Sequence, residues 1–174
     1  MNILNKINPI EVDGEIINVI IEIQKGSKNK YEFDKETGMI KLDRVSHTSQ
    51  DFPFDYGFVP NTLWHDGDPL DVVMMTSYAL MPGILLEARP VAIMHMTDSG
   101  ESDAKIICVP TQDPRFDTVK SIEDITPHLL KEYKHFYENY KTLQNKVVTI
   151  DGMGGKEEAW KAIHESLKLF NKNK

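Results

Sequence analysis

The stretch Asp66-Gly67-Asp68-Pro69-Leu70-Asp71-Val72-Val73-Met74-Met75 joins an acidic turn directly to an apolar strand. Its first six residues hold three carboxylates with no Lys or Arg between them. Because Pro69 prevents a regular helix, these carboxylates do not share one helical face. Crowded carboxylates repel one another, so they become protonated, spread into water or bind a cation. A solvated Asp-Gly turn is the alternative, since Asp, Gly and Pro are common in turns.

Strands are predicted on both sides of this segment. The β-branched and apolar runs predict strands over residues 15–24, 31–34, 39–44, 72–77, 84–96, 104–109 and 147–150. The second and third form a hairpin that turns at Gly38. Residues 50–71, rich in Asp, Pro and Gly, predict a long irregular segment. A loop of that length inside a domain is usually functional.

Two helices are predicted near the end of the chain. The first begins at Thr126-Pro127, an N-cap followed by proline, and its apolar residues at helical spacing are Leu129, Tyr133, Phe136, Tyr137 and Tyr140. The second follows Gly154-Gly155 and places one apolar face at Trp160, Ile163, Leu167 and Phe170. Because the strands precede the helices, we expect an α+β, mainly β fold whose sheet closes into a small barrel.

Length and composition narrow the class of protein. A chain of 174 residues with 40% hydrophobic residues suits a single domain, residues 1–174. The net charge of -7 argues against a nucleic-acid binder or a basic membrane-surface protein. No apolar run approaches the ~18 residues of a membrane span. The lone Cys108 excludes an internal disulfide and lies in an apolar run, where a buried thiol is expected. We therefore expect a soluble, cytoplasmic protein.

A second acidic cluster, Asp98, Glu101 and Asp103, follows another apolar strand. Oxygen ligands from two loops suit a hard cation such as Mg²⁺ or Mn²⁺. An EF-hand does not fit, because the twelfth position counted from Asp66 is Ser77 rather than Glu. A zinc site does not fit either, since no His or Cys has ligand spacing with these acids. A calcium-binding structural domain stays an alternative.

Cations accompany these acids in the same segments, at Lys30, Arg44, Lys105 and Lys141. A solvated surface role is the default for any one of them. Beside a metal site, however, they meet the needs of phosphoryl transfer, in which cations neutralise the charge of the phosphoryl group. The sequence has neither a P-loop nor a GxSxG elbow, so other common hydrolase templates are missing.

The segment from Asp66 to Val72 resembles the D-G-D-P-[LV]-D-V signature of the family I soluble inorganic pyrophosphatases. The resemblance covers about residues 8 to 145. Other segments resemble that family in the same order: residues 19–23, 30–32, 43–44, 55–58, 96–98, 103–105 and 136–141. It implies a five-stranded barrel of OB type with two or more peripheral helices. It also implies a homo-oligomer, with a hexamer favoured, that hydrolyses pyrophosphate to two phosphates.

The resemblance also implies a set of site residues. Several Mg²⁺ ions, for which Mn²⁺ or Zn²⁺ can substitute, would be bound by Asp66, Asp71, Asp98 and Asp103. Glu22 and Glu32 match auxiliary carboxylates near the metals, and Asp68 matches the residue that takes a proton from the attacking water. The positions that match phosphate-binding residues are Lys30, Arg44, Tyr56, Lys105, Tyr140 and Lys141.

The chemistry of the residues agrees with these roles. Water held by two divalent ions loses a proton near neutral pH, and Asp68 could accept it. Arg44 can hold a phosphate by two parallel hydrogen bonds, and tyrosine hydroxyls can donate to phosphate oxygens. For Tyr140 a core position is the alternative, because it shares the apolar spacing of the first helix. The proposed site has seven carboxylates and four cations, so about two divalent ions would turn it net positive.

Three positions depart from the family pattern: Phe52 and Phe58, where tyrosine is frequent, and Gln24, where proline is usual. We expect these changes to alter tuning or packing rather than remove activity. A non-catalytic OB-type module that binds nucleic acid or polyphosphate is a second alternative function. The acidic charge opposes it, because such clusters repel a phosphate backbone in the absence of metal.

Overall fold

Strands dominate the computed structural model, which describes residues 3–173. Its strands are β1 (Ile17–Ile23), β2 (Asn29–Asp34), β3 (Met39–Val45), β4 (Asp55–Phe58), β5 (Asp71–Met74), β6 (Leu85–Asp98), β7 (Glu101–Ser102), β8 (Lys105–Pro110) and β9 (Val148–Gly155). The helices are α1 (Pro127–Asn139) and α2 (Lys156–Lys172). Short 3₁₀ turns lie at Ile3–Lys6, Pro114–Phe116, Ile122–Asp124 and Thr142–Gln144.

Five strands close into a ring in the order β1-β4-β5-β8-β6, because β6 also pairs with β1. Only the β5–β8 pairing within this ring is parallel, and it sets Asp71 beside Lys105. β9 adds to the outside of the long strand β6, and β7 pairs with the end of β6. This arrangement confirms the predicted mainly β, α+β class and its five-stranded barrel.

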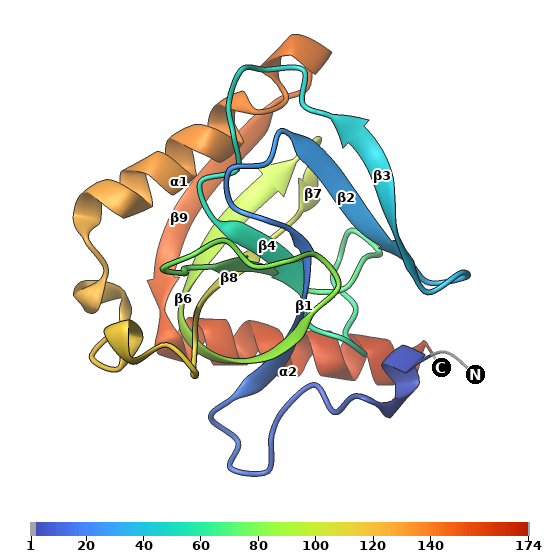
Figure 1. Cartoon of the computed structure of the whole chain (residues 1–174), viewed down its shortest axis with the longest axis vertical. Coiled ribbons are helices and arrows are strands. Elements are labelled where there is room, and N and C mark those ends of the chain that lie inside the picture. Colours follow the sequence, from blue (N-terminus) through green and yellow to red (C-terminus); the bar gives the residue numbers. More distant parts are fainter. Residues whose placement is uncertain (1–2, 174) are drawn as a thin grey trace.

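The ring encloses apolar side chains, and each helix covers one flank of it (Figure 1). All seven residues of β1 are buried, as expected for a strand in a closed ring. α2 packs Ala159, Ala162 and Ile163 against the ring. α1 contributes Tyr133 and other aromatic rings to a cluster that includes Phe54. These two clusters fix the strands whose ends carry the predicted site residues.

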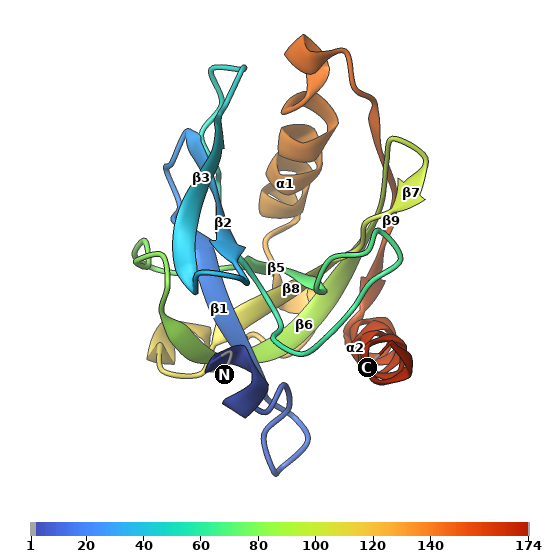
Figure 2. The ribbon, with the colours of Figure 1, turned by 90° about the vertical axis from the view of Figure 1, so that its right-hand side faces the viewer.

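The hairpin of β2 and β3 forms a sheet of its own beside the ring. It stands on one side of the molecule, whereas β7 and part of β9 stand on the other, with α1 between and behind them (Figure 2). The backbone N–H of Phe33 on β2 donates to the Glu22 carboxylate on β1 at 2.6 Å, which joins the hairpin to the ring. The ring and its neighbours thus surround one open end, where the ends of β5, β6 and β8 meet.

Two sequence predictions about the strands were wrong. The segment 50–71 is not wholly irregular, because β4 lies within it. β4 is only four residues long and lacks an apolar alternation, since both of its faces are buried. Its Gly57 is required by close packing, because a Cβ there would meet the Ile20 carbonyl oxygen at 2.0 Å. β9 continues through Gly155 rather than ending at Ile150.

Both helices form where they were predicted, with corrections in detail. Thr126 precedes α1, but its side chain makes no capping hydrogen bond. The buried face of α2 consists of Ala159, Ala162, Ile163 and Ser166. Trp160, Leu167 and Phe170 are only partly buried, because small residues bring the helix close to the sheet. Within residues 3–173, neither helix combines the length and apolarity that crossing a membrane requires.

Candidate active site

A cavity of about 380 Å³ opens at the end of the ring. It gathers side chains from β1, β2, β4, β5, β6, β8 and the end of α1, although they are far apart in the sequence. Of the predicted site residues, those that line it are Glu22, Lys30, Glu32, Tyr56, Asp66, Asp68, Asp71, Asp98, Asp103, Lys105, Tyr140 and Lys141. The remaining one, Arg44, lies instead in a small adjoining cavity that shares Lys30 and Tyr140.

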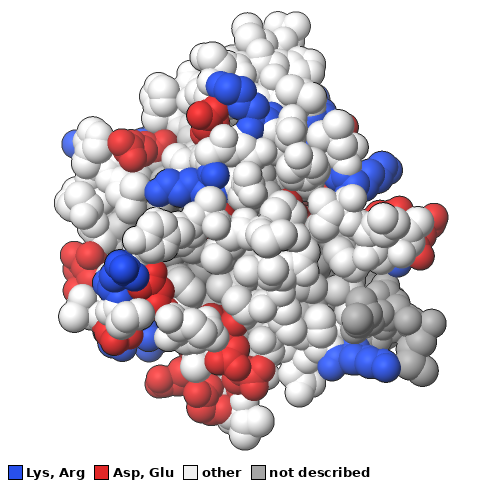
Figure 3. Space-filling view, viewed as in Figure 1, with Lys and Arg blue, Asp and Glu red and all other residues white. Residues whose placement is uncertain are grey.

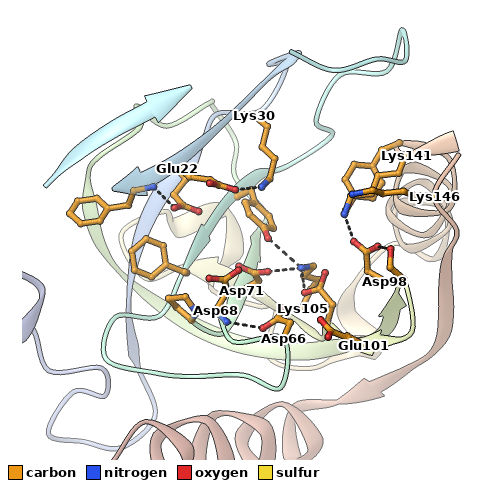
Figure 4. A pocket seen from close by; sticks show the side chains of 18 of the residues that line it. Glu22, Lys30, Asp66, Asp68, Asp71, Asp98, Glu101, Lys105, Lys141 and Lys146 are labelled. Atoms are coloured by element: carbon orange, nitrogen blue, oxygen red, sulfur yellow. Dashed lines mark hydrogen bonds and ion pairs between the residues drawn. The ribbon is translucent and has the colours of Figure 1, made fainter. Parts of the chain in front are cut away.

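The floor of the cavity, defined here as Asp71, Asp103 and Lys105, is a buried ionic cluster (Figure 4). The Lys105 ammonium lies 2.5 Å from the Asp71 carboxylate and also binds Asp103. The Tyr56 hydroxyl lies 3.3 Å from the same ammonium. Lys105 is only 2% exposed, so water does not screen these charges. The parallel pairing of β5 with β8 thus places the opposite charges of Asp71 and Lys105 next to each other.

Asp66 joins the floor carboxylates in a cluster suited to a cation. One oxygen from each of Asp66, Asp71 and Asp103 lies within 4.8 Å of the others. Burial and the nearby Asp103 and Asp71 charges raise the pKa of Asp66 to about 6, against a hydrogen bond from the Asp68 N–H. Burial, with Asp103, also raises the pKa of Asp71, although Lys105 opposes it. Burial is thus the main cause of both shifts, and the neighbouring carboxylates add to it.

The pKa of Lys105 is also displaced. Burial alone would lower it, but Asp71 and Asp103 outweigh burial and hold it well above its usual value. Burial raises the pKa of the Tyr56 phenol as well. At neutral pH Lys105 is therefore a permanent ammonium ion paired with Asp71 and Asp103, and Tyr56 beside it carries a neutral hydroxyl.

The helix wall, defined as Asp98, Tyr140, Lys141 and Lys146, forms one side of the cavity (Figure 4). Lys141 pairs with Asp98, and this hydrogen bond holds the pKa of Asp98 below its usual value although burial opposes it. Asp98 was predicted to share the metal cluster, but it does not belong to the close group of three carboxylates. Its carboxylate faces the cavity from the end of β6 and is engaged by Lys141.

The hairpin wall, defined as Lys30, Glu32, Asp43 and Arg44, stands on β2 and β3. Lys30 and Glu32 line the main cavity, and Arg44 lines the small adjoining one. Lys30 pairs with Glu32 and lies 3.5 Å from Asp43, which also binds Arg44 at 2.6 Å. The strand register sets Lys30 directly opposite Arg44. Deeper in the cavity, burial raises the pKa of Glu22 to about 8, although the Phe33 N–H opposes this shift. On the hairpin wall, the Asp43 carboxylate thus holds the Lys30 and Arg44 side chains next to each other.

Asp68 lies at the exposed lip of the cavity, in the turn that also carries Asp66. Its backbone N–H donates to the Asp66 carboxylate at 3.0 Å, and Gly67 between them adopts a φ of 88°. Among the described residues, no hydrogen bond or ion pair engages the Asp68 carboxylate itself. The turn therefore keeps Asp68 available beside the carboxylate cluster.

Seven further residues line the cavity that were not among the predicted site residues: Phe33, Lys35, Phe58, Pro69, Ser99, Glu101 and Lys146. Glu101 was visible in the second acidic cluster, and its register partner across the turn is Asp98. Phe58 was noted only as a departure from the family pattern. Lys35 and Lys146 carry no comparable sequence signal, because each lies in a short connection whose path only the fold reveals.

Comparisons with known proteins bear on this geometry. The family model described as inorganic pyrophosphatase matches residues 19–171. The chain belongs to the inorganic pyrophosphatase family. The inorganic pyrophosphatase of Geobacillus stearothermophilus is 48% identical over 162 residues, covering 93% of this chain and 98% of that protein. That of Sulfolobus acidocaldarius is 45% identical over 166 residues, covering 94% of this chain and 96% of its own.

Solved structures of the family have the same fold. The inorganic pyrophosphatase of Thermus thermophilus aligns with a TM-score of 0.91 at 37% identity, covering 95% of this chain and 97% of that one. The inorganic pyrophosphatase from Neisseria gonorrhoeae aligns with a TM-score of 0.92 at 38% identity, and the alignment covers 97% of this chain and 98% of that one. The predicted resemblance and the prediction of an enzyme are confirmed. The expected extent of residues 8 to 145 was too short, because the match includes α2.

Proposed function

We propose that this protein hydrolyses pyrophosphate to two phosphates with the help of Mg²⁺. The observation that carries the proposal is the cluster of Asp66, Asp71 and Asp103 at the base of a cavity with cationic walls. Membership of the inorganic pyrophosphatase family supports the choice of substrate. The geometry supports the choice of chemistry, because it combines a candidate cation site, phosphate-binding side chains and an unpaired carboxylate.

The residues fit a divalent cation. Their donor set is entirely oxygen, which is the set that Mg²⁺ prefers. Burial chiefly, with the neighbouring carboxylates, raises the pKa values of Asp66 and Asp71, and a further positive charge beside them would favour their ionised forms. Asp66, Asp71 and Asp103 would hold the cation, and Asp98, Glu22 and Glu32 line the same cavity. Bound there, Mg²⁺ would neutralise phosphate charge and make a water molecule more acidic.

The walls would bind the substrate from two sides. Lys30 and Arg44 on the hairpin wall are held together by Asp43. Lys141 and Tyr140 face them from the helix wall. Arg44 can bind one phosphate through two parallel hydrogen bonds, whereas the lysines act as point charges. At the floor, Lys105 and the Tyr56 hydroxyl can donate to the phosphate nearest the carboxylate cluster.

Asp68 is the proposed proton acceptor. It neighbours Asp66 across a tight turn, but it stands outside the cluster of three carboxylates. A carboxylate in that position can take a proton from water that attacks the phosphorus atom, without itself being occupied by a cation. No Ser or Cys nucleophile is needed for this reaction, and Cys108 is fully buried away from the cavity, in the apolar core.

Release of phosphate from pyrophosphate tests the proposal. The wild-type protein should release phosphate with Mg²⁺ and none after Mg²⁺ is removed with EDTA. Asp66→Asn should abolish the Mg²⁺-dependent rate, whereas Asp117→Asn, an exposed carboxylate outside the cavity, should retain it. No release by the wild-type protein at saturating Mg²⁺ would rule the proposal out. Replacing Mg²⁺ with Mn²⁺ or Zn²⁺ in the same assay measures which ions substitute.

Two other functions make different predictions. A calcium-binding domain would be stabilised by Ca²⁺, whereas our proposal expects Ca²⁺ to inhibit, because its looser coordination misplaces the attacking water. A binding module for nucleic acid would need a broad basic surface. On the face in Figure 3, basic and acidic side chains alternate around an uncharged centre. That face therefore offers no broad basic surface to an extended polyanion.

The domain organisation, the location and the oligomeric state of the enzyme are also part of the proposal. We propose that residues 1–174 act as one domain in the cytoplasm and assemble into a homo-oligomer, with a hexamer favoured by the family resemblance. α1 carries His135 beside a second, outward-facing cavity, which is a candidate subunit contact. Sedimentation of the wild-type protein measures the mass of the assembly directly.

A further inference from the structure

The loop between β4 and β5, residues 59–70, carries Asp66 and Asp68 and ends next to Asp71. Its first and last residues are joined by a backbone hydrogen bond from the Val59 N–H to the Leu70 carbonyl at 2.9 Å. A loop of this length can adopt many shapes, and the one in this structure places carboxylate oxygens of Asp66 and Asp103 within 4.8 Å of each other. Some part of the loop must therefore select that shape.

Thr62 makes the contacts that close the loop. Its hydroxyl donates to the Val59 carbonyl at 2.6 Å and accepts from the Leu70 N–H at 2.9 Å. The side chain is 3% exposed, so water does not replace either hydrogen bond. Leu70 directly follows Pro69, which has no N–H of its own, and directly precedes Asp71. One hydroxyl therefore links the start of the loop to the residue beside a floor carboxylate.

The rest of the loop is already fixed around this link. The Trp64 N–H donates to the Asp68 carbonyl at 2.7 Å, and the Gly67 N–H donates to the Trp64 carbonyl at 3.1 Å. These bonds define the turn that carries Asp66 and Asp68, which lie beside each other in Figure 4. The Leu63 N–H, next to Thr62, donates to the Ser166 carbonyl on α2 at 3.1 Å. Thr62 is thus the junction between the acidic turn and the strands of the ring.

We propose that Thr62 is a positioning residue for the carboxylate cluster, acting through the backbone of Val59 and Leu70. Both of its hydroxyl hydrogen bonds go to main-chain atoms, so it touches neither substrate nor cation. Ligand groups that move by about 1 Å lose much of their effect, which gives a buried hydroxyl control over cation affinity. The inference rests on the proposed function, because it assigns the cluster to a divalent cation.

The test is Mg²⁺ binding to the substrate-free protein, measured by titration calorimetry. Thr62→Val keeps the shape of the side chain but leaves the Leu70 N–H and the Val59 carbonyl unpaired. It should weaken Mg²⁺ binding by about tenfold, whereas Thr62→Ser, which keeps the hydroxyl, should stay within about twofold of wild type. If Thr62→Val does not fold, Thr62→Cys replaces it, because a thiol is a much weaker hydrogen-bonding group.

A matched control separates positioning from general stability. Ile125→Val shortens a buried side chain in the cluster beneath α1 and should lower the melting temperature without changing Mg²⁺ affinity. Unchanged Mg²⁺ affinity in Thr62→Val, at a melting temperature lowered as in this control, would overturn the inference alone. A wild-type protein that binds Mg²⁺ but releases no phosphate would instead overturn the proposed reaction and leave Thr62 with its positioning role. No Mg²⁺ binding by wild type would overturn both.

Discussion

The floor and the hairpin wall of the cavity both pair lysine with carboxylates, yet they are built differently. The floor side chains are 3% exposed for Lys105 and 16% for Asp71, whereas those of the hairpin wall are 24% for Lys30 and 48% for Glu32. Neighbouring strands of the closed ring hold the floor. The hairpin wall stands on a two-stranded sheet beside the ring.

Because of this difference in burial, the ion pairs of the floor and those of the hairpin wall should contribute differently to stability and activity. Buried charges lose several kcal/mol each of hydration and depend on their partners, so the floor must remain paired for the fold to persist. Exposed pairs contribute only about 0–1 kcal/mol, so the wall can exchange its carboxylates for a phosphate at little expense to stability. Changes at the floor should therefore affect folding and activity together, and changes at the wall should affect activity alone.

Asp68 provides the largest expected effect on activity without any effect on folding. Asp68→Asn removes the proposed proton acceptor but keeps the side-chain size. Turnover should fall by about 10²–10⁴-fold, because that is the usual contribution of a positioned base. The measurement is kcat for phosphate release at saturating Mg²⁺ and pyrophosphate.

The control for Asp68→Asn is the free energy of unfolding. Since the Asp68 carboxylate has no ion-pair or hydrogen-bond partner among the described residues, that free energy should not change by more than about 0.5 kcal/mol. Near-normal turnover in the folded variant would remove Asp68 from the proposed role.

Matched lysine variants test the contrast directly. Lys105→Met leaves Asp71 and Asp103 as buried carboxylates without their cation, so the free energy of unfolding in EDTA should fall by about 3–5 kcal/mol. Lys30→Met should change that quantity by less than about 1 kcal/mol. Urea denaturation of both variants gives the comparison.

Activity completes the contrast between the two lysines. Lys30→Met should raise KM for pyrophosphate by about tenfold, because one charged contact to phosphate is lost. Added Mg²⁺ should restore part of the stability of Lys105→Met, since a divalent cation replaces the lost charge. Equal losses of stability in the two variants would contradict the distinction between floor and wall.

The contrast also explains what the sequence could predict. The floor carboxylates and Lys105 lie in continuous segments that resemble motifs of the family, so the resemblance pointed to them from the sequence. The separate position of Arg44 depends on the register of β2 with β3, which sets it opposite Lys30 and beside Asp43. That register is a property of the folded hairpin. The ion pair of Asp98 with Lys141 likewise joins segments that are far apart in the sequence, and the metal role expected for Asp98 stays a prediction.

The fold, like the site, was predictable from the sequence only in part. Long apolar strands such as β6 gave a clear signal, and so did the turn at Gly38 between β2 and β3. β4 gave none, because Asp55 and Gly57 are unusual in strands. Local contacts in the folded protein accommodate both residues in β4. Buried Asp55 accepts hydrogen bonds from the Lys25 and Leu80 N–H groups, and Gly57 lets β1 approach closely.

Glu22 predicts a smaller effect on stability that depends on pH. Burial raises its pKa from 4.5 to about 8 in the folded protein. Between these values the folded state holds a proton that the unfolded state has released, so this contribution to stability is complete below pH 4.5 and is lost as pH rises through 8. The slope from this group approaches about 1.4 kcal/mol per pH unit.

Urea denaturation in EDTA at pH 5 to 8 measures that slope. Glu22→Gln should reduce the slope without abolishing it, because the raised pKa values of Asp66 and Asp71 add losses of the same sign. An unchanged slope would show that Glu22 is ionised in the folded protein. Exposed Glu123→Gln, in the 3₁₀ turn before α1, is the matched control and should leave the slope unchanged, because among the described residues no ion pair or hydrogen bond engages its carboxylate.

Phe52 provides the smallest expected effect. Its ring is 6% exposed and lies 4.9 Å from the Phe136 ring, and it borders the small cavity that contains Arg44 rather than the main one. Phe52→Tyr restores the hydroxyl that is frequent in the family, but the new group enters an aromatic cluster. We therefore expect kcat to stay within about threefold of wild type, a change below 1 kcal/mol in barrier height. A rise of several-fold in kcat would instead show that a hydroxyl beside Arg44 takes part in phosphate binding, and that the hairpin wall reaches further into the reaction than its exposure suggests.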